Sequence, residues 1–176
     1  MRKVILYIAM SLDGYIADRK GNVNWLAGQD DAGEQIDTYG AFINEVDTVV
    51  MGWSTYRQIT TELSPEEWPY QGLTTYVITH RRQPSSADIR FVQEGPCSLV
   101  RRLREEQGRA IWICGGSRII QPLVREDLLD VYHISVIPTI LGAGLPLFAE
   151  ISQKIKLKLR STHVYNGIVE SVYVRR

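Results

Sequence analysis

Five short apolar runs, separated by segments of helical periodicity, constrain the fold of this chain more than any other feature. Each run is rich in β-branched or aromatic residues and is bounded by turn residues, as expected of strands buried on both faces. The runs cover residues 4–10, 47–52, 74–80, 110–114 and 131–138, and helical patterns lie at 31–45, 96–107 and 116–125. Strands that alternate with helices predict βαβ units, a mostly parallel sheet and therefore an α/β fold.

The C-terminal end shows a different pattern, with period-two alternation on both sides of Asn166–Gly167. An Asn-Gly pair between alternating segments is the strongest short-range signal for a two-residue hairpin. We therefore expect an antiparallel hairpin to close the sheet. The alternation also places four basic residues on one face, which we interpret as a solvated surface that resists aggregation. These residues are Lys154, Lys156, Lys158 and Arg160.

Length and composition predict one domain over residues 1–176, without nucleic-acid or membrane partners. The 176 residues fit a single domain, and 20 basic residues balance 20 acidic ones, so no net field attracts polyanions. The two cysteines, Cys97 and Cys114, show neither a disulfide framework nor metal-ligand spacing, which favours a reducing cytoplasm and no metal. No apolar run approaches the roughly 20 residues of a membrane span.

Glycines stand where a strand run ends and a helix pattern begins. Gly115 and Gly116 follow the run 110–114, and Arg118 comes shortly after them. Such a junction exposes helix amides at the carboxyl edge of a parallel sheet, where phosphates bind. The alternative interpretation of two glycines here is a tight turn.

Two other strand ends have a similar character. Gly52 precedes Ser54 and Thr55, either of which could cap a helix, and the run 74–80 leads into Arg81 and Arg82. Because carboxyl ends of parallel strands share one edge, we predict a phosphate-rich ligand along it. The alternative is that both arginines are exposed loop charges.

Several motifs together resemble the dihydrofolate reductase superfamily, most closely the reductase domain of the riboflavin-pathway deaminase-reductase and its stand-alone relatives. In chain order they are IAMSLDGYIA, Trp25, VDTVVMGWSTY, VITHRR, ICGGSRII and VIPTILGAGLPLF. The resemblance runs from about residue 3 to the C-terminal hairpin. It implies a three-layer dihydrofolate reductase-like fold, a mostly parallel twisted sheet, an NADPH-dependent oxidoreductase and a possible homodimer.

The resemblance also assigns a cofactor site. By similarity, Ala9 and Ile16 line the nicotinamide pocket, and a cis peptide joins the two glycines. The adenosine half is assigned to Gly52, Trp53, Ser54 and Thr55, the 2′-phosphate to Thr79, His80 and Arg81, and the pyrophosphate to Gly115, Gly116, Ser117, Arg118 and Ile119. Trp53 replaces an arginine that is usual in the family, which shifts phosphate recognition to Arg81 or Arg82.

In dihydrofolate reductase one buried carboxylate on the first helix does the polar work. Asp31 and Asp37 are the catalytic candidates, with Asp30 as a further alternative to Asp31, and each could equally be an exposed helix charge. Trp25 and Phe42 are candidates for the wall of the substrate pocket, although both are ordinary core residues by default. Asp13 in SLDG is foremost a turn residue.

The substrate motifs depart from the family pattern. The stretch after the second strand's helix reads QITTELSPEEWPYQ, and Cys114 stands where the riboflavin reductase has a glutamate. The expected function is reduction of a small heterocycle, with 5-amino-6-(5-phosphoribosylamino)uracil reduction as the nearest family activity. The alternatives are a dihydrofolate or pterin reductase, and a non-catalytic NADP-binding or scaffold protein.

Overall fold

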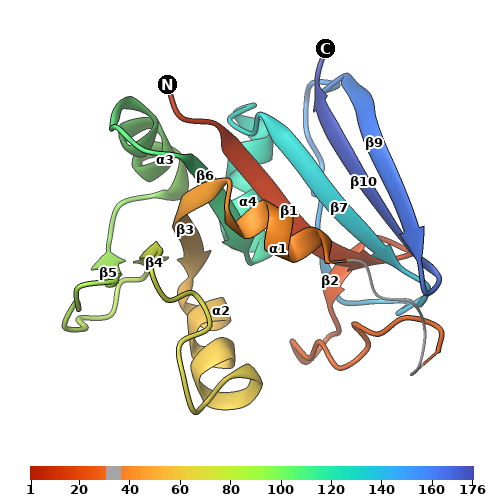
Figure 1. Cartoon of the computed structure of the whole chain (residues 1–176), viewed down its shortest axis with the longest axis horizontal. Helices are drawn as coiled ribbons and strands as arrows, with labels where there is room; N and C mark the ends of the chain where they lie inside the picture. The colour runs from red at the N-terminus through yellow and green to blue at the C-terminus, as the bar shows by residue number, and fades with distance from the viewer. Residues whose placement is uncertain (31–36) are drawn as a thin grey trace.

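The computed structural model describes residues 1–30 and 37–176, and an eight-stranded twisted sheet runs through its centre (Figure 1). The strand order is β5-β4-β3-β6-β1-β7-β10-β9. Its strands are β1 Val4–Ser11, β3 Val46–Gly52, β4 Thr74–Ile78, β5 Ile89–Val92, β6 Ala110–Gly115, β7 Val131–Ile137, β9 Leu157–Tyr165 and β10 Ile168–Arg175. A second, two-stranded sheet pairs β2, Tyr15–Ala17, with β8, Leu145–Pro146.

The strand pairing confirms the predicted α/β topology. The pairs among β5, β4, β3, β6, β1 and β7 are parallel, whereas β10 runs antiparallel to both β7 and β9. The hairpin turn lies at Asn166 and Gly167, whose φ angles of 45° and 73° are those that a two-residue turn between twisted strands requires. The antiparallel closure of the sheet is therefore as predicted.

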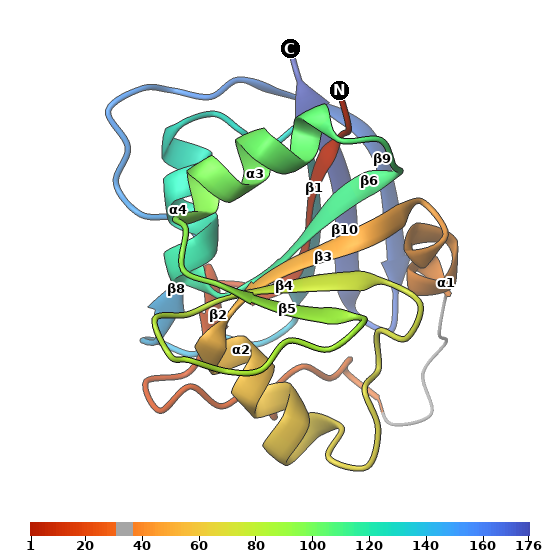
Figure 2. The same cartoon turned by 90° about the vertical axis from the view of Figure 1, so that its left-hand side faces the viewer.

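Helices cover both faces of the sheet, which gives three layers. α3, Pro96–Glu105, and α4, Ser117–Arg125, lie on one side, and the short α1, Thr38–Ile43, lies on the other (Figure 2). The helix predicted over residues 31–45 is shorter in the structure, where α1 covers Thr38–Ile43. Residues 31–36 of the prediction lie outside the described residues.

α2, Trp53–Gln58, continues directly into a π-helical turn, η1, Ile59–Leu63. The N-cap of α2 is Gly52, and no side chain caps this end. The predicted capping role of Ser54 or Thr55 is therefore wrong, because the helix begins one residue after the strand ends and both side chains already belong to its first turn.

Each face of the sheet has its own apolar core. Under α3 and α4 lie fully buried side chains such as Leu103 and Leu123, at the helical spacing that the sequence shows. On the other face Phe42 of α1 and Ile59 of η1 belong to one buried cluster with Trp112 of β6. Burying one such side chain contributes about 2 kcal/mol, so the two cores fix the sheet and with it the strand ends.

The SLDG turn and the LGAG loop hold each other at the carboxyl edge of the sheet. The Asp13 carboxylate accepts hydrogen bonds from the backbone nitrogens of Leu141 (3.1 Å) and Gly142 (2.7 Å). Gly144 lies so close to Ala17 that a Cβ atom there would be 2.1 Å from the Ala17 carbonyl oxygen. Asp13 is therefore a loop anchor, in accord with its reading as a turn residue.

No helix within residues 1–30 and 37–176 has both the length and the apolarity that crossing a bilayer demands.

Candidate functional site

A cavity of about 550 Å³ opens at the carboxyl edge of the sheet, between the loop after β2 and the α2–η1 helix. Strand β1 contributes Ile8 and Ala9 to its wall, β6 contributes Cys114, and Gly116 lies at the start of α4. The remaining lining residues are Ile16, Ala17, Lys20, Gly21, Asn22, Val23, Leu26, Trp53, Ser54, Thr55, Arg57, Gln58, Ile59, Glu62, Leu63, Tyr70, Arg81 and Leu145.

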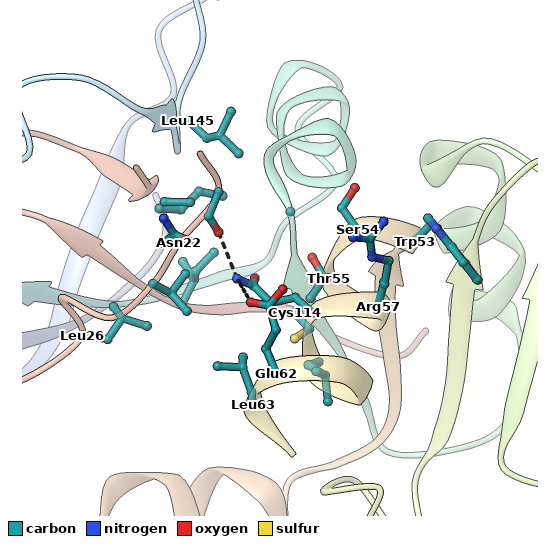
Figure 3. Close-up of a pocket in the computed structure, with 18 of the residues that line it drawn as sticks. Asn22, Leu26, Trp53, Ser54, Thr55, Arg57, Glu62, Leu63, Cys114 and Leu145 are labelled. Carbon is teal, nitrogen blue, oxygen red and sulfur yellow. Dashed lines mark hydrogen bonds between the residues drawn. The ribbon is translucent and has the colours of Figure 1, made fainter. Parts of the chain in front are cut away.

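The two sides of the cavity differ in chemistry. Figure 3 shows Trp53 and Ser54 of α2 on one side and the apolar Leu26 and Leu63 on the other. One hydrogen bond, from Gln58 Nε2 to the Gly21 carbonyl oxygen at 2.9 Å, links α2 to the loop after β2 (Figure 3). The cavity is thus bounded by a polar helix, a bridged loop and an apolar end.

The charge of the cavity differs from that of the whole chain. Three cationic side chains, Lys20, Arg57 and Arg81, line it, and among the residues the structure describes Glu62 is the one carboxylate of its wall. The chain as a whole has no net charge. This local excess of positive charge favours an anionic ligand.

Arg81 joins the cavity to a second depression. Its guanidinium carbon lies 5.3 Å from the centre of the Trp53 ring, a cation–π arrangement, and Trp53 in turn lies 6.3 Å from Phe91. A depression of about 400 Å³ next to it is lined in part by Arg81, Arg82 and Phe91. A flat aromatic face and two arginines are therefore adjacent at this end.

The glycine junction has the geometry that the resemblance implied. The Gly115–Gly116 peptide is cis, and Gly115 has a φ of 133°, a backbone conformation that favours glycine. A Cβ atom at Gly116 would lie 3.6 Å from Thr55 Oγ1, an ordinary contact distance, so Gly116 and Thr55 of α2 are neighbours in the wall of the cavity. α4 begins directly after it, at Ser117.

Tyr70 and Cys114 meet at the wall of the cavity. The Tyr70 hydroxyl lies 3.8 Å from Cys114 Sγ. Burial, reinforced by the nearby thiol, holds the pKa of Tyr70 far above its ordinary value, and burial raises the pKa of Cys114 to about 11. Both groups are therefore protonated at neutral pH.

The structure brings part of the predicted cofactor site together. Seven of its residues line the cavity: Ala9, Ile16, Trp53, Ser54, Thr55, Arg81 and Gly116. Gly52 and Ile119 are in contact range, since a Cβ at Gly52 would meet Ile119 Cγ1 at 3.3 Å. Thr79 is buried and its Oγ1 accepts a hydrogen bond from the Arg81 nitrogen at 3.1 Å.

The other predicted cofactor contacts lie outside this cavity. His80 and Arg118 are exposed, and neither they nor Gly115 and Ser117 line it. Gly115 and Ser117 flank Gly116, so they adjoin the cavity along the chain. Their predicted roles toward a dinucleotide stay predictions.

Those predicted substrate and proton-donor residues that the structure describes do not line the cavity. Asp37 caps α1, where its Oδ1 accepts a hydrogen bond from the Gly40 nitrogen at 2.6 Å. Phe42 is buried and stacks on Tyr7, with ring centres 4.3 Å apart. Trp25 donates a hydrogen bond to the Asn22 carbonyl oxygen at 3.2 Å. None of these three lines the cavity, and Asp31 lies outside the described residues.

Several lining residues were not singled out from the sequence as functional. They are Lys20, Asn22, Leu26, Gln58, Glu62, Leu63, Tyr70 and Leu145, together with Cys114, which was noted only as a departure from the family. The one local signal is the Trp-Pro-Tyr triplet at 68–70, which places two aromatic rings in an otherwise polar loop.

Comparison with known proteins places the chain in a family. Residues 2–170 match the model of the RibD C-terminal domain. The chain belongs to this family. A relative in Bacillus subtilis (strain 168), the uncharacterized protein YwjB, is 40% identical over 175 residues, which cover 99% of this chain and 98% of YwjB.

Solved structures agree with this placement. A putative riboflavin biosynthesis protein from Shewanella sp. PV-4 superposes with a TM-score of 0.84 at 27% identity, covering 99% of both chains. The deaminase/5-amino-6-(5-phosphoribosylamino)uracil reductase of Thermotoga maritima gives 0.73 at 19% identity, covering 99% of this chain and 57% of that one.

The fold is that of dihydrofolate reductase. The Enterococcus faecalis enzyme, in complex with NADP(H), gives a TM-score of 0.67 at 17% identity, with 99% of this chain and 96% of that one covered. The three-layer, dihydrofolate reductase-like fold expected from the sequence is thereby confirmed.

Proposed function

We propose that this protein is an NADPH-dependent reductase of a small heterocyclic carbonyl or imine, with the cofactor bound in the 550 Å³ cavity. The observation that carries the proposal is that the Trp53–Arg81 pair, Ala9 and Gly116 all line one cavity. A dinucleotide has this sequence of parts: a flat base, a phosphate-bearing ribose, a pyrophosphate and a second ring. The dihydrofolate reductase of the same fold binds NADP(H).

Each end of the cavity suits one part of the cofactor. Trp53 offers an aromatic ring for the adenine, and Arg81, whose guanidinium carbon lies 5.3 Å from the centre of that ring, carries a fixed charge for the 2′-phosphate. Gly116 opens the path to the N-terminal amides of α4, which favour the pyrophosphate. Ala9 is small enough to leave room for the nicotinamide, which when bound supplies the hydride.

The substrate would enter from the apolar end. Leu26 and Leu63 lie there and suit the face of a flat ring (Figure 3). The nearest named activity among the structural neighbours is 5-amino-6-(5-phosphoribosylamino)uracil reduction. We propose this pyrimidine and related flat heterocycles as the substrate class.

Arg81→Ala tests the cofactor assignment. Loss of one charge-assisted contact to a phosphate weakens NADPH binding about tenfold or more, whereas NADH, which lacks that phosphate, changes less than about twofold. Tryptophan fluorescence and calorimetric titration measure both affinities. Arg125→Ala, in the last turn of α4 and outside the cavity, is the matched control. Equal losses for both cofactors would show that Arg81 does not recognise the 2′-phosphate.

The same titration separates the alternatives. Binding of NADPH followed by its oxidation with dihydrofolate, but not with aminopyrimidines, would favour a folate reductase. NADPH binding without turnover of any heterocycle would favour a non-catalytic NADP-binding protein. Absence of NADPH binding at millimolar cofactor, measured also as no thermal shift, would reject the proposal.

A further inference from the structure

One wall of the cavity is the loop of residues 18–30, all of which the structure describes and none of which belongs to a helix or strand. This loop follows β2 and contributes Lys20, Gly21, Asn22, Val23 and Leu26 to the lining. Because a loop lacks the regular backbone hydrogen bonds of a helix or sheet, the groups that anchor it set its position. The anchors therefore decide how well this wall is ordered before a ligand arrives.

The first half of the loop is anchored beside the cavity. The Asp18 carboxylate accepts hydrogen bonds from the backbone nitrogens of Lys20 (2.7 Å) and Asn22 (2.9 Å), which shapes a local turn. The bond from Gln58 to the Gly21 carbonyl oxygen then joins this turn to α2.

The second half of the loop needs a different anchor. The hydrogen bonds that Trp25, Leu26 and Ala27 donate stay within the loop, at 3.2, 3.2 and 2.8 Å, so they shape it without fixing it to the sheet. An attachment further along the chain must therefore hold Leu26 in the wall.

Asn166, in the turn of the C-terminal hairpin, provides this attachment. Its carbonyl oxygen accepts a hydrogen bond from the Gln29 nitrogen, and its Oδ1 accepts one from the Asp30 nitrogen, each at 3.0 Å. Its Nδ2 donates a hydrogen bond to the Asp30 carbonyl oxygen at 2.9 Å. Gly28 comes so close that a Cβ atom there would lie 2.2 Å from Asn166 Nδ2. Three hydrogen bonds and this close approach join the loop to the hairpin.

The turn itself does not require the amide group of Asn166. A two-residue hairpin turn needs a residue that tolerates a φ of 45° here, and glycine does so as well as asparagine. Nor does Asn166 belong to the described residues that line the cavity. The amide therefore serves the contact with the loop, and it can affect a ligand only through the loop.

We propose that Asn166 is a positioning residue of the cavity, whose amide fixes the end of the loop and thereby the place of Leu26 and its neighbours in the wall. The inference rests on the proposed function for the identity of the ligand. It goes beyond that function because it gives a hairpin turn, 136 residues further along the chain than Asp30, a share in ligand binding. A wall that is ordered in advance loses less conformational entropy when the ligand binds.

Asn166→Gly is the direct test, because glycine keeps the turn and removes only the amide. Hydrogen–deuterium exchange followed by mass spectrometry should show the amides of residues 19–30 exchanging about tenfold faster, with β9 and β10 and the urea midpoint nearly unchanged. NADPH and NADH should both bind about fivefold more weakly, since binding must now order the loop. This equal loss differs from the loss expected for Arg81→Ala, which falls on NADPH.

A second variant and a control complete the test. Gly28→Ala breaks the contact from the side of the loop, because its Cβ cannot occupy the space beside Asn166 Nδ2, and it should reproduce both effects. Asn44→Ala is the matched control. Its Nδ2 donates a hydrogen bond to the Gly40 carbonyl oxygen at 2.9 Å, at the end of α1, so its loss should change neither the exchange of the loop nor the cofactor affinities.

The outcomes separate the two proposals. Exchange of residues 19–30 that is equal in the wild type and Asn166→Gly overturns the inference, as does faster exchange with unchanged cofactor affinity. If Asn166→Gly also loosens β9 and β10, Gly28→Ala gives the answer, because it leaves the turn intact: weaker cofactor binding supports the inference and unchanged binding overturns it. A wild type that binds neither cofactor instead overturns the proposed function, and the exchange rates, which need no ligand, then support or overturn the role of Asn166 in fixing the wall.

Discussion

The cavity and the polar cluster around Glu170 lie on the same face of the sheet, and their polar groups are surrounded differently. Adjacent strands align Ala9 with Ser135 and Ser135 with Glu170, so the two regions are neighbours in one row of the sheet. Glu170 is 1% exposed. Its oxygens lie near four potential donors: Thr38 Oγ1 and His133 Nε2, each at 2.8 Å, and Ser135 Oγ and Tyr165 OH, each at 3.4 Å.

Comparing Glu170 with Tyr70 shows two different roles for a polar group that is removed from bulk solvent. The Glu170 carboxylate borders a depression of about 350 Å³ under α1, and its Oε2 accepts hydrogen bonds from Thr38 and Ser135, so it ties β10 to α1 and β7, whereas its Oε1 lies 2.8 Å from His133 Nε2 without forming a hydrogen bond. Tyr70 lines the 550 Å³ cavity, and among the described residues its hydroxyl has one weak polar contact, with Cys114 Sγ at 3.8 Å. A polar group that protein already satisfies contributes to folding, whereas one left facing a cavity can meet a ligand.

Glu170→Ala should have the largest effect on stability. Removing this buried carboxylate leaves the hydroxyls of Thr38, Ser135 and Tyr165 without their common acceptor, which lowers the free energy of unfolding by about 3 kcal/mol. Urea denaturation measures this loss, and Glu150→Ala, at an exposed position, is the control. NADPH affinity of the folded protein should be unchanged. A loss below about 1 kcal/mol, or a large loss of NADPH affinity, would contradict the division between the two regions.

Gly144→Ala should lower the stability less than Glu170→Ala and should change the wall of the cavity. The new Cβ would lie 2.1 Å from the Ala17 carbonyl oxygen, so the β2–β8 pair must separate, at a cost of about 2 kcal/mol. Because Ala17 and Leu145 line the cavity, NADPH binding should weaken as well. The control is Gly142→Ala, which has open space but a φ of 71°, and should cost about 1 kcal/mol. An NADPH affinity that Gly144→Ala leaves unchanged would show that this wall of the cavity does not contact the cofactor.

The smallest and most local expected effect is a difference between the two cysteines in how far NADPH protects them from alkylation. Burial raises the pKa of both Cys97 and Cys114 to about 11, so alkylation by iodoacetamide should be slow at pH 8 and should rise as the pH approaches 11. NADPH should slow the reaction of Cys114, which lines the cavity, and leave that of Cys97 on α3 unchanged. Mass spectrometry of the two peptides measures both rates. Protection of neither thiol would contradict cofactor binding beside Cys114.

The same pKa values predict how stability depends on pH. A buried thiol that is neutral in the folded protein ionises earlier in the unfolded chain, near its ordinary value of 9.0. Its contribution to stability is therefore complete below pH 9 and is lost as the pH rises from 9 to 11. Cys114→Ala should remove this part of the alkaline decline.

The fold could be predicted from the sequence to a large extent because its strands are buried on both faces. Such strands appear as continuous β-branched runs, which the segments forming β1, β3, β4, β6 and β7 all show. β5 was missed because it is a four-residue edge strand with little burial, and β2 and β8 because strands of three and two residues have no readable period.

The site was only partly predictable, for a physical reason. The cofactor residues were assigned through motifs at strand ends, whereas Tyr70 and Cys114 are 44 residues apart and meet only because η1 and its following loop fold back over β6. The resemblance to dihydrofolate reductase pointed to Asp31 and Asp37, near the first helix, as candidates for a buried carboxylate. The most buried carboxylate among the described residues is Glu170, whose place beneath Thr38 follows from strand register and not from local sequence.

The hydrogen bonds from Leu141 and Gly142 to Asp13 join two segments that are far apart in the chain, so the cavity can form only late in folding. The wall of the cavity contains residues from the first 20 positions and Leu145. A nascent chain emerging from the ribosome therefore lacks this wall until most of the chain has been made. The proposed cofactor, NADPH, should therefore stabilise only chains in which these distant segments have already met, so it should act late in folding and not at its beginning.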